Sequence, residues 1–117
     1  MQRFEGSKGY VAQAADNGTF VTVLTAPAGH HIKVTYFLVA ATGAVTVDAK
    51  WVKSGTDVVF LHAKNMNASD LVEFGGSEGK FLILTDQDTI QVKCSAADAT
   101  VIISYELFPH QGSNIVL

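Results

Sequence analysis

Histidine side chains are the first candidates for chemistry in this chain, because imidazole nitrogens bind metal ions. His30 and His31 are adjacent, and His62 lies in a later segment. A zinc ion needs three or four converging nitrogen or sulfur ligands, yet adjacent residues of a strand point to opposite faces of a sheet. An all-β metalloenzyme would need a His-x-His pair on one strand face, and the sequence has none. We therefore expect histidines at strand ends, with no metal site and no cofactor.

Carboxylates supply two further candidate groups. Asp86, Asp88 and Asp98 fall at the ends of strand-like segments, and clustered carboxylates bind hard cations such as calcium. The spacing of an EF-hand loop is missing, so we expect these side chains to accept hydrogen bonds from backbone N–H groups in turns. Glu73 and Glu106 are of the residue type that glycoside hydrolases use as a pair. No pattern in the sequence brings these two glutamates together.

The chain offers no recognisable nucleophile or phosphate-binding loop. Cys94, the single cysteine, falls on the apolar side of its segment, which predicts a buried thiol; a reactive thiol needs an exposed, electropositive setting. One cysteine forms no internal disulfide, as expected of a protein made in a reducing cytoplasm. The glycines within 75–79 lack the Gly-Lys-Ser/Thr ending of a phosphate loop. We therefore expect that the protein is not an enzyme.

Four large aromatic side chains would suit a platform on which sugars stack: Tyr10, Tyr36, Trp51 and Tyr105. Trp51, however, alternates in phase with Val45, Val47 and Ala49, which favours packing in the core. A carbohydrate-binding module stays open as an alternative function, and it requires these aromatic side chains to be exposed on one sheet face.

The elements that must position these residues are strands. In 89–95, Ile90, Val92 and Cys94 alternate with polar residues, and 100–107 alternates in the same way. A period of two means that one face is buried and the other is solvated. We therefore predict an antiparallel hairpin formed by these two segments over a sandwich core.

The rest of the chain repeats this pattern. Further strands are predicted over 10–14, 19–26, 31–40, 45–52, 57–64, 71–74 and 81–84, separated by turn residues such as Asn17-Gly18, Pro27-Ala28-Gly29 and Ser54-Gly55. No segment has convincing helical periodicity. The predicted fold class is all-β: an antiparallel β-sandwich, jelly-roll-like, with eight or nine short strands.

The strand over 31–40 is apolar on both faces near its end. Ile32, Val34, Tyr36 and Leu38 form one alternating set, and Lys33, Thr35, Phe37 and Val39 form the other. We take the first set as the core face. Phe37 and Val39 then make the second face apolar near its end, which predicts a covered surface or a contact with another subunit.

Length and composition bound the remaining possibilities. The 117 residues suit a single domain over 1–117, 48% of them are hydrophobic and 16% charged, and the net charge is −3. We expect no nucleic-acid partner, since a basic patch is lacking. We also expect no membrane association, since no stretch approaches about 20 apolar residues, and no signal peptide, since 1–8 has no apolar core.

Both ends of the chain are candidate interaction segments. We predict an N-terminal arm over 1–9 and a C-terminal tail over 109–117. The residues expected to contact neighbouring proteins are Gln2, Arg3 and Phe4 in the arm and Ile115, Val116 and Leu117 in the tail. An apolar tip on a polar tether is suited to docking, although chain ends fray unless they are held.

The order of these segments resembles that of small all-β virion proteins of tailed bacteriophages. The matching parts lie within residues 18–108 and read Thr25-Ala-Pro-Ala-Gly29, Val34-Thr-Tyr-Phe-Leu-Val39, Ala44-Val-Thr-Val47, Leu84-Thr-Asp-Gln-Asp-Thr-Ile-Gln-Val92 and Ile103-Ser-Tyr-Glu-Leu107. The chain departs from the pattern at Gln87, where such proteins usually have glycine.

The resemblance implies a structural role in the virion, made in the host cytoplasm. Within that class it favours a capsid decoration, or cement, protein that binds the outside of the shell and bridges capsid subunits. The implied partners are the major capsid protein or other virion proteins, and further copies of the chain in a homo-oligomer. A neck or tail-hub protein of the same fold is the nearest alternative.

Overall fold

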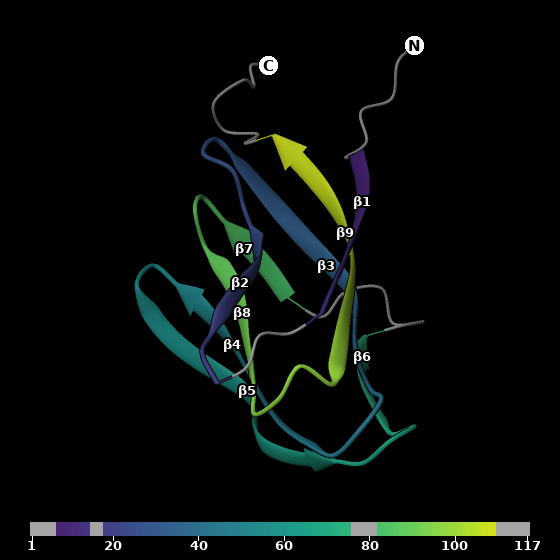
Figure 1. Ribbon diagram of the computed structural model, residues 1–117. Helices are drawn as coiled ribbons and strands as arrows, with labels where there is room; N and C mark the ends of the chain where they lie inside the picture. Colours follow the sequence, from purple (N-terminus) through teal and green to yellow (C-terminus); the bar gives the residue numbers. More distant parts are fainter. Residues whose placement is uncertain (1–6, 15–17, 76–81, 110–117) are drawn as a thin grey trace, which may run out of the picture.

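The computed structural model describes residues 7–14, 18–75 and 82–109, and in this part of the chain the regular elements are strands (Figure 1). Nine strands are present: β1 (Ser7–Ala14), β2 (Val21–Thr25), β3 (His30–Ala41), β4 (Val45–Lys53), β5 (Thr56–Met66), β6 (Leu71–Gly75), β7 (Leu82–Thr85), β8 (Thr89–Cys94) and β9 (Ala99–Pro109). The described residues include no helix long and apolar enough to span a membrane.

The strands form two antiparallel sheets. Sheet A has the order β1-β9-β3-β6, with β7 also pairing to β3, and sheet B has the order β2-β8-β4-β5. If β6 and β7 are counted as one interrupted strand, this is the eight-stranded jelly roll built from two Greek keys. The predicted all-β sandwich with jelly-roll-like character is therefore confirmed.

The core lies between the sheets and is lined by one alternate set of side chains from each strand. In β8 these are Ile90, Val92 and Cys94, as predicted, and in β9 they include Val101 and Ile103. All five are 0% exposed. Burial of such β-branched and aliphatic side chains stabilises the sandwich at roughly 25 cal/mol per Å² of apolar surface.

The predicted hairpin of the last two strands is wrong. β8 pairs with β2 and β4 in sheet B, whereas β9 pairs with β1 and β3 in sheet A. The connection between them crosses from one sheet to the other, and Ala99 at its end is already buried. Alternation along a strand reports which face is buried, but it does not report which strand lies alongside.

A β-bulge interrupts β3 at Thr35. Val34 is paired with Tyr105 and Tyr36 with Ser104, so Thr35 is an extra residue in the ladder between β3 and β9. The Thr35 hydroxyl donates a hydrogen bond to the backbone oxygen of Ser104 at 3.1 Å. The side chain of the extra residue thus anchors the bulge to the neighbouring strand.

The bulge exchanges the two faces of β3. Because side chains alternate strictly along a strand, one extra residue turns the later part of the strand over. Phe37 and Val39 are 0% exposed and lie in the core. The predicted subunit contact at Phe37 and Val39 is therefore wrong, and Tyr36 and Leu38 face outward in their place.

Two strands pair with the other side of β3, one before the bulge and one after it. β7 pairs with β3 before Thr35, and β6 pairs with it after Thr35. β6 ends at Gly75, opposite Tyr36, with φ at 94°. A Cβ atom at position 75 would collide with the backbone carbonyl oxygen of Thr35. Only glycine fits this position without displacing the bulge.

The chain ends are only partly within the described residues. β1 begins at Ser7 rather than at position 10, so residues 7–9 of the predicted arm pair with β9. Outside the described residues lie the predicted contact residues Gln2, Arg3, Phe4, Ile115, Val116 and Leu117. The arm, the tail and the extent of the single domain remain predictions.

We expect Gly75→Ala to lower the free energy of unfolding by about 2 kcal/mol or more, because it adds both a clash and backbone strain. Gly29→Ala is the matched control, since Gly29 has φ at 78° but no atom within 4 Å of an added Cβ. The control should lose about 1 kcal/mol from conformational strain alone. Urea unfolding of both variants measures the difference, and equal losses would contradict the clash with Thr35.

Candidate functional site

The histidines do not converge. His30 and His31 begin β3 in sheet A, and the Nδ1 atom of His30 lies 3.1 Å from the carbonyl oxygen of Ala28. His62 lies on β5 in sheet B with its side chain 83% exposed, and its Nδ1 atom lies 3.2 Å from an oxygen of Asp48. Across the described residues, no group of three or more His, Cys, Asp or Glu side chains is placed to hold a metal ion.

Asp88 binds backbone and side-chain donors, as predicted for a turn aspartate. It is 2% exposed. One carboxylate oxygen accepts the Ser54 N–H at 3.0 Å, and the other accepts the N–H of Thr85 at 3.0 Å and its hydroxyl at 3.2 Å. Asp88 therefore ties the turn between β4 and β5 of sheet B to the end of β7 in sheet A.

The pKa of Asp88 reflects two opposing effects. Burial disfavours the charged form and would raise the pKa. The hydrogen bonds from Thr85 and Ser54, with the positive charge of Lys53, favour the carboxylate and lower it. The hydrogen bonds prevail, and the pKa of Asp88 lies below its ordinary value. The group is thus a structural clasp that is charged at neutral pH.

Asp86 and Asp98 also lie in turns, but they do not join Asp88 in a cation site. A carboxylate oxygen of Asp86 accepts the Gly29 N–H at 2.7 Å. The backbone oxygen of Asp98 accepts the Thr42 N–H at 2.8 Å, in the connection between β8 and β9. Each of the three aspartates is therefore hydrogen-bonded to a different connection between strands.

The glutamates and aromatic side chains are also separated. Glu73 accepts a hydrogen bond from the Tyr36 hydroxyl at 2.5 Å, and Glu106 pairs with Lys33 at 3.1 Å. The bond to Glu73, with desolvation and the glutamate charge, raises the pKa of Tyr36. Trp51 lies in sheet B, across the core from the sheet that carries Tyr36. Glu73 and Glu106 thus bind different partners, and among the described side chains Trp51 shares no sheet face with Tyr36.

Cys94 is 0% exposed, as predicted for a core thiol. Burial, with the nearby charge of Asp48, raises the pKa of Cys94 to about 11. The thiolate needed for nucleophilic attack is therefore strongly disfavoured at neutral pH.

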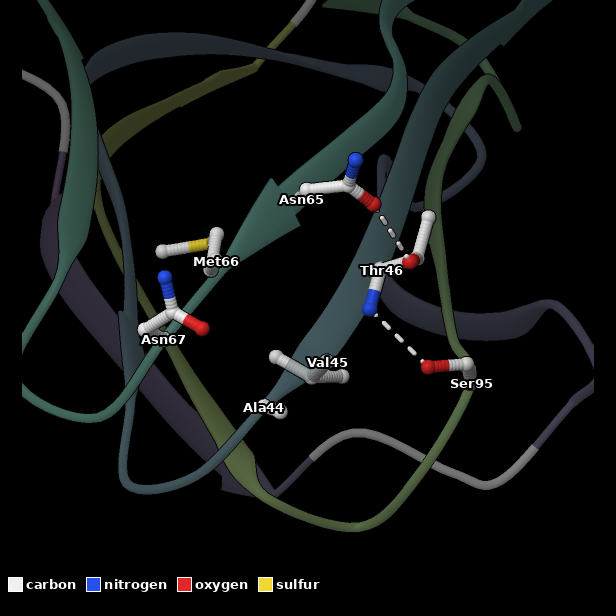
Figure 2. Close-up of a pocket in the computed structure, with 7 residues that line it drawn as sticks. All are labelled: Ala44, Val45, Thr46, Asn65, Met66, Asn67 and Ser95. Carbon is white, nitrogen blue, oxygen red and sulfur yellow. Dashed lines mark hydrogen bonds between the residues drawn. The ribbon is translucent and has the colours of Figure 1, made fainter.

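A hollow of about 350 Å³ opens where β4 begins and β5 ends (Figure 2). The Thr46 hydroxyl donates to the Asn65 side-chain oxygen at 2.9 Å, and the Thr46 N–H donates to the Ser95 hydroxyl at 2.9 Å. The N–H of Ser95 returns a bond to the Thr46 carbonyl. These polar groups bind one another, so they hold strand ends together and present no arrangement for acid–base or nucleophilic chemistry.

The most distinctive surface is the outer side of sheet A. Since the bulge turns β3 over, its outward residues after Thr35 are mainly apolar. They lie beside outward apolar residues of β6 and β9: Leu38 is opposite Ile102, and Ala40 is opposite Leu71. We use the name A face for the outward apolar residues Leu38, Ala40, Leu71, Ile83 and Ile102.

The A face has exposed apolar side chains beside neutralised charges. Leu71 is 52% exposed and Ile83 42%. The ion pair of Lys33 with Glu106 lies beside Ile83, since Lys33 is opposite both residues. An apolar centre with a polar border is the usual composition of a protein-binding surface. The sequence pattern missed this face because it placed Leu38 in the core.

Comparison with known proteins gives structural similarities at low sequence identity. No protein-family model matches the chain, and no curated protein matches it. A chain of the cyanophage Pam1 capsid asymmetric unit is 11% identical with a TM-score of 0.49, over 91% of this chain and 89% of that chain. A chain of the T13 viral particle of infectious bursal disease virus is 12% identical with a TM-score of 0.48, over 90% of this chain.

The chain spans about a third (31%) of that bursal disease virus chain. A de novo designed double-stranded β-helix is 14% identical with a TM-score of 0.32, over 86% of this chain and 96% of that one. All three TM-scores are below 0.5, so the fold is assigned from the strand pairing described above.

We expect Asp88→Asn to lower the free energy of unfolding by about 1–3 kcal/mol at pH 7, because buried donors lose a charged acceptor. The folded pKa is below the ordinary 3.8, so this stabilisation is present above that value and is lost as the pH falls further. The difference between the two proteins should therefore shrink in acid. Urea unfolding at pH 7 and pH 3 measures this difference in the free energy of unfolding, and the exposed Asp98→Asn is the control. The same difference at both pH values would contradict a charged Asp88 carboxylate.

Proposed function

We propose that this chain is a structural protein of a bacteriophage virion, and specifically a capsid decoration protein that binds the outside of the shell and bridges its subunits. The observation that carries the proposal is the A face, an apolar surface on the outer side of sheet A. A surface of this kind is suited to another protein rather than to a small substrate.

The sequence resemblance supports the same class of protein. Its quoted segments fall on the elements that build the sandwich: 25–29 connects β2 to β3, 84–92 contains Asp88 and the first part of β8, and 103–107 lies in β9. At the departing position, Gln87 has φ of 68°, which is the left-handed region that favours glycine.

Decoration would stabilise a shell by mass action. A protein that binds only the assembled state adds its binding free energy to that state at each occupied site. The A face supplies apolar area, and beside it the charge of Lys33 is paired with that of Glu106. The partners are accordingly the major capsid protein or another virion protein.

The copy number per virion tests the proposed position. Quantitative mass spectrometry of purified particles should give one copy per capsid subunit, or one per few subunits. A copy number that fits a single ring of subunits would contradict the decoration role and favour a neck or tail-hub protein. Absence from the particle would overturn the virion role and favour a carbohydrate-binding module.

We expect the double variant Leu38→Ser with Ile102→Ser to weaken binding to undecorated shells by at least about tenfold, or about 1.4 kcal/mol. Both side chains are on the A face and outside the core, so the variant should keep its fold. Val52→Ser, on the outer side of sheet B, is the matched control and should bind normally. Co-sedimentation with shells measures binding. Normal binding by the folded double variant would show that the A face is not the surface that binds the shell.

A further inference from the structure

The β5 strand has an unpaired apolar edge. It pairs with β4 and with no other described strand. In its first half, Val58 is 41% exposed and Val59 53%. Consecutive residues of a strand face opposite sides of the sheet, so this edge is apolar on both sides. Such an edge is a template for pairing with another strand.

The second half of β5 is protected against such pairing. His62 and Ala63 form a bulge opposite Asp48, and the Ala63 N–H donates to the Asp48 carboxylate at 2.9 Å with φ of Ala63 at 49°. Lys64 lies opposite the core-facing Val47 and places a charge on the inner side of the edge. Bulges and inward charges are devices that prevent edge pairing. Pairing is therefore restricted to the first half of the strand.

The other edge strands with described side chains are shorter. β6 and β7 have five and four residues and pair with β3 on opposite sides of Thr35. β2 has five residues and is bulged between Thr22 and Leu24. The first half of β5 combines two neighbouring exposed valines with a continuous register against β4 from Thr56 to Val59.

The turn that precedes β5 fixes the direction of its backbone groups. Ser54 and Gly55 have φ of 51° and 84°, which is typical of a two-residue type I′ hairpin. Lys53 and Thr56 close this turn as a pair that exchanges hydrogen bonds. Along two antiparallel strands, pairs that exchange backbone hydrogen bonds alternate with pairs that are not hydrogen-bonded to each other.

By this alternation, Val58 exchanges hydrogen bonds with Trp51 of β4. Asp57 and Val59 therefore direct their N–H and C=O groups away from β4, toward the free edge. An added antiparallel strand must bond to these two residues. If the added strand belongs to a second copy of the chain, its bonding residues are again Asp57 and Val59. In the allowed registers, one of these two residues therefore lies opposite one of the same two in the other copy.

We propose that a second copy of this chain pairs with the edge around a two-fold axis, with Val58 opposite Val58 of the second copy. Asp57 of each copy then exchanges hydrogen bonds with Val59 of the other. A register one step toward the turn would set two Asp57 side chains opposite each other, which is destabilising. A register one step further would extend into the irregularity between Val59 and Leu61.

The proposed register continues an existing apolar row on the inner side of sheet B. Leu24, Ile90, Trp51 and Val58 are successive cross-strand neighbours in this row. Leu24 and Ile90 are buried, Trp51 is half-buried, and Val58 is exposed. Val58 of the second copy adds the next member and covers the open end of the row. The two four-stranded B sheets become one continuous sheet.

Cysteine substitution tests the register. In a non-exchanging antiparallel pair the Cα atoms are about 4.5 Å apart, which is within the roughly 4.4–6.8 Å that a disulfide spans. We expect Val58→Cys to form a covalent dimer readily when a mild oxidant is added. Val59→Cys is the matched control, because Val59 lies opposite Asp57 and should cross-link at least about tenfold more slowly. The native Cys94 is buried and does not compete.

Non-reducing electrophoresis of the two purified variants reads out the cross-link. Rapid cross-linking of Val58→Cys alone supports the proposed register. Equal rates for the two variants, or no cross-link from either, would overturn it.

A second test does not depend on cross-linking. Proline at position 59 removes an N–H that the proposal directs outward, and an edge strand tolerates proline there in the monomer. Val59→Pro should raise the dissociation constant of the dimer at least about tenfold, measured by analytical ultracentrifugation, with an unchanged circular dichroism spectrum. Wild-type protein that stays at 12.5 kDa at every concentration would contradict self-pairing. The inference is independent of the proposed function, since both tests use the isolated chain.

Discussion

The β-bulge at Thr35 is the constraint on which the rest of this sandwich depends. It places Phe37 and Val39 in the core, and it gives the outward positions of β3 to Tyr36 and Leu38. It also requires glycine at position 75, because the Thr35 carbonyl leaves no room for a side chain. A single extra residue, held by one hydroxyl, thereby determines both the core and the A face.

A second constraint holds the opposite end of the molecule. Asp88 accepts hydrogen bonds from Ser54 and Thr85 and so joins the two sheets where hydrophobic packing alone would not fix their relative position. The Ser54–Gly55 turn held by this clasp begins β5. The position of the exposed Val58 and Val59 edge therefore depends on the same carboxylate, because β5 leaves the turn directly.

Much of the fold follows from sequence patterns, and the errors have physical causes. The alternation in 89–95 identifies a buried face correctly, since burial is what imposes a period of two. It does not identify strand neighbours, so the pairing of β8 with β9 was wrong. For β3, the apolar run from Tyr36 to Ala41 suits either face. The phase change is shown by the register shift between Val34 and Tyr36, where Thr35 bonds to Ser104. The A face depends on that contact between residues far apart in sequence.

The distribution of apolar residues connects these points. A two-layer sandwich needs one apolar set of side chains from each strand, yet this chain carries apolar residues on both sides of β3 and along both sides of the first half of β5. These surplus residues are gathered on the A face and on one edge, while the other half of that edge has a bulge and an inward lysine that oppose pairing. Because only the second half of β5 is protected against strand pairing, we infer that the exposed first half is used for a contact with another chain. The A face and the β5 edge lie on different sheets, so a pair of copies joined at β5 leaves both A faces free for a further protein.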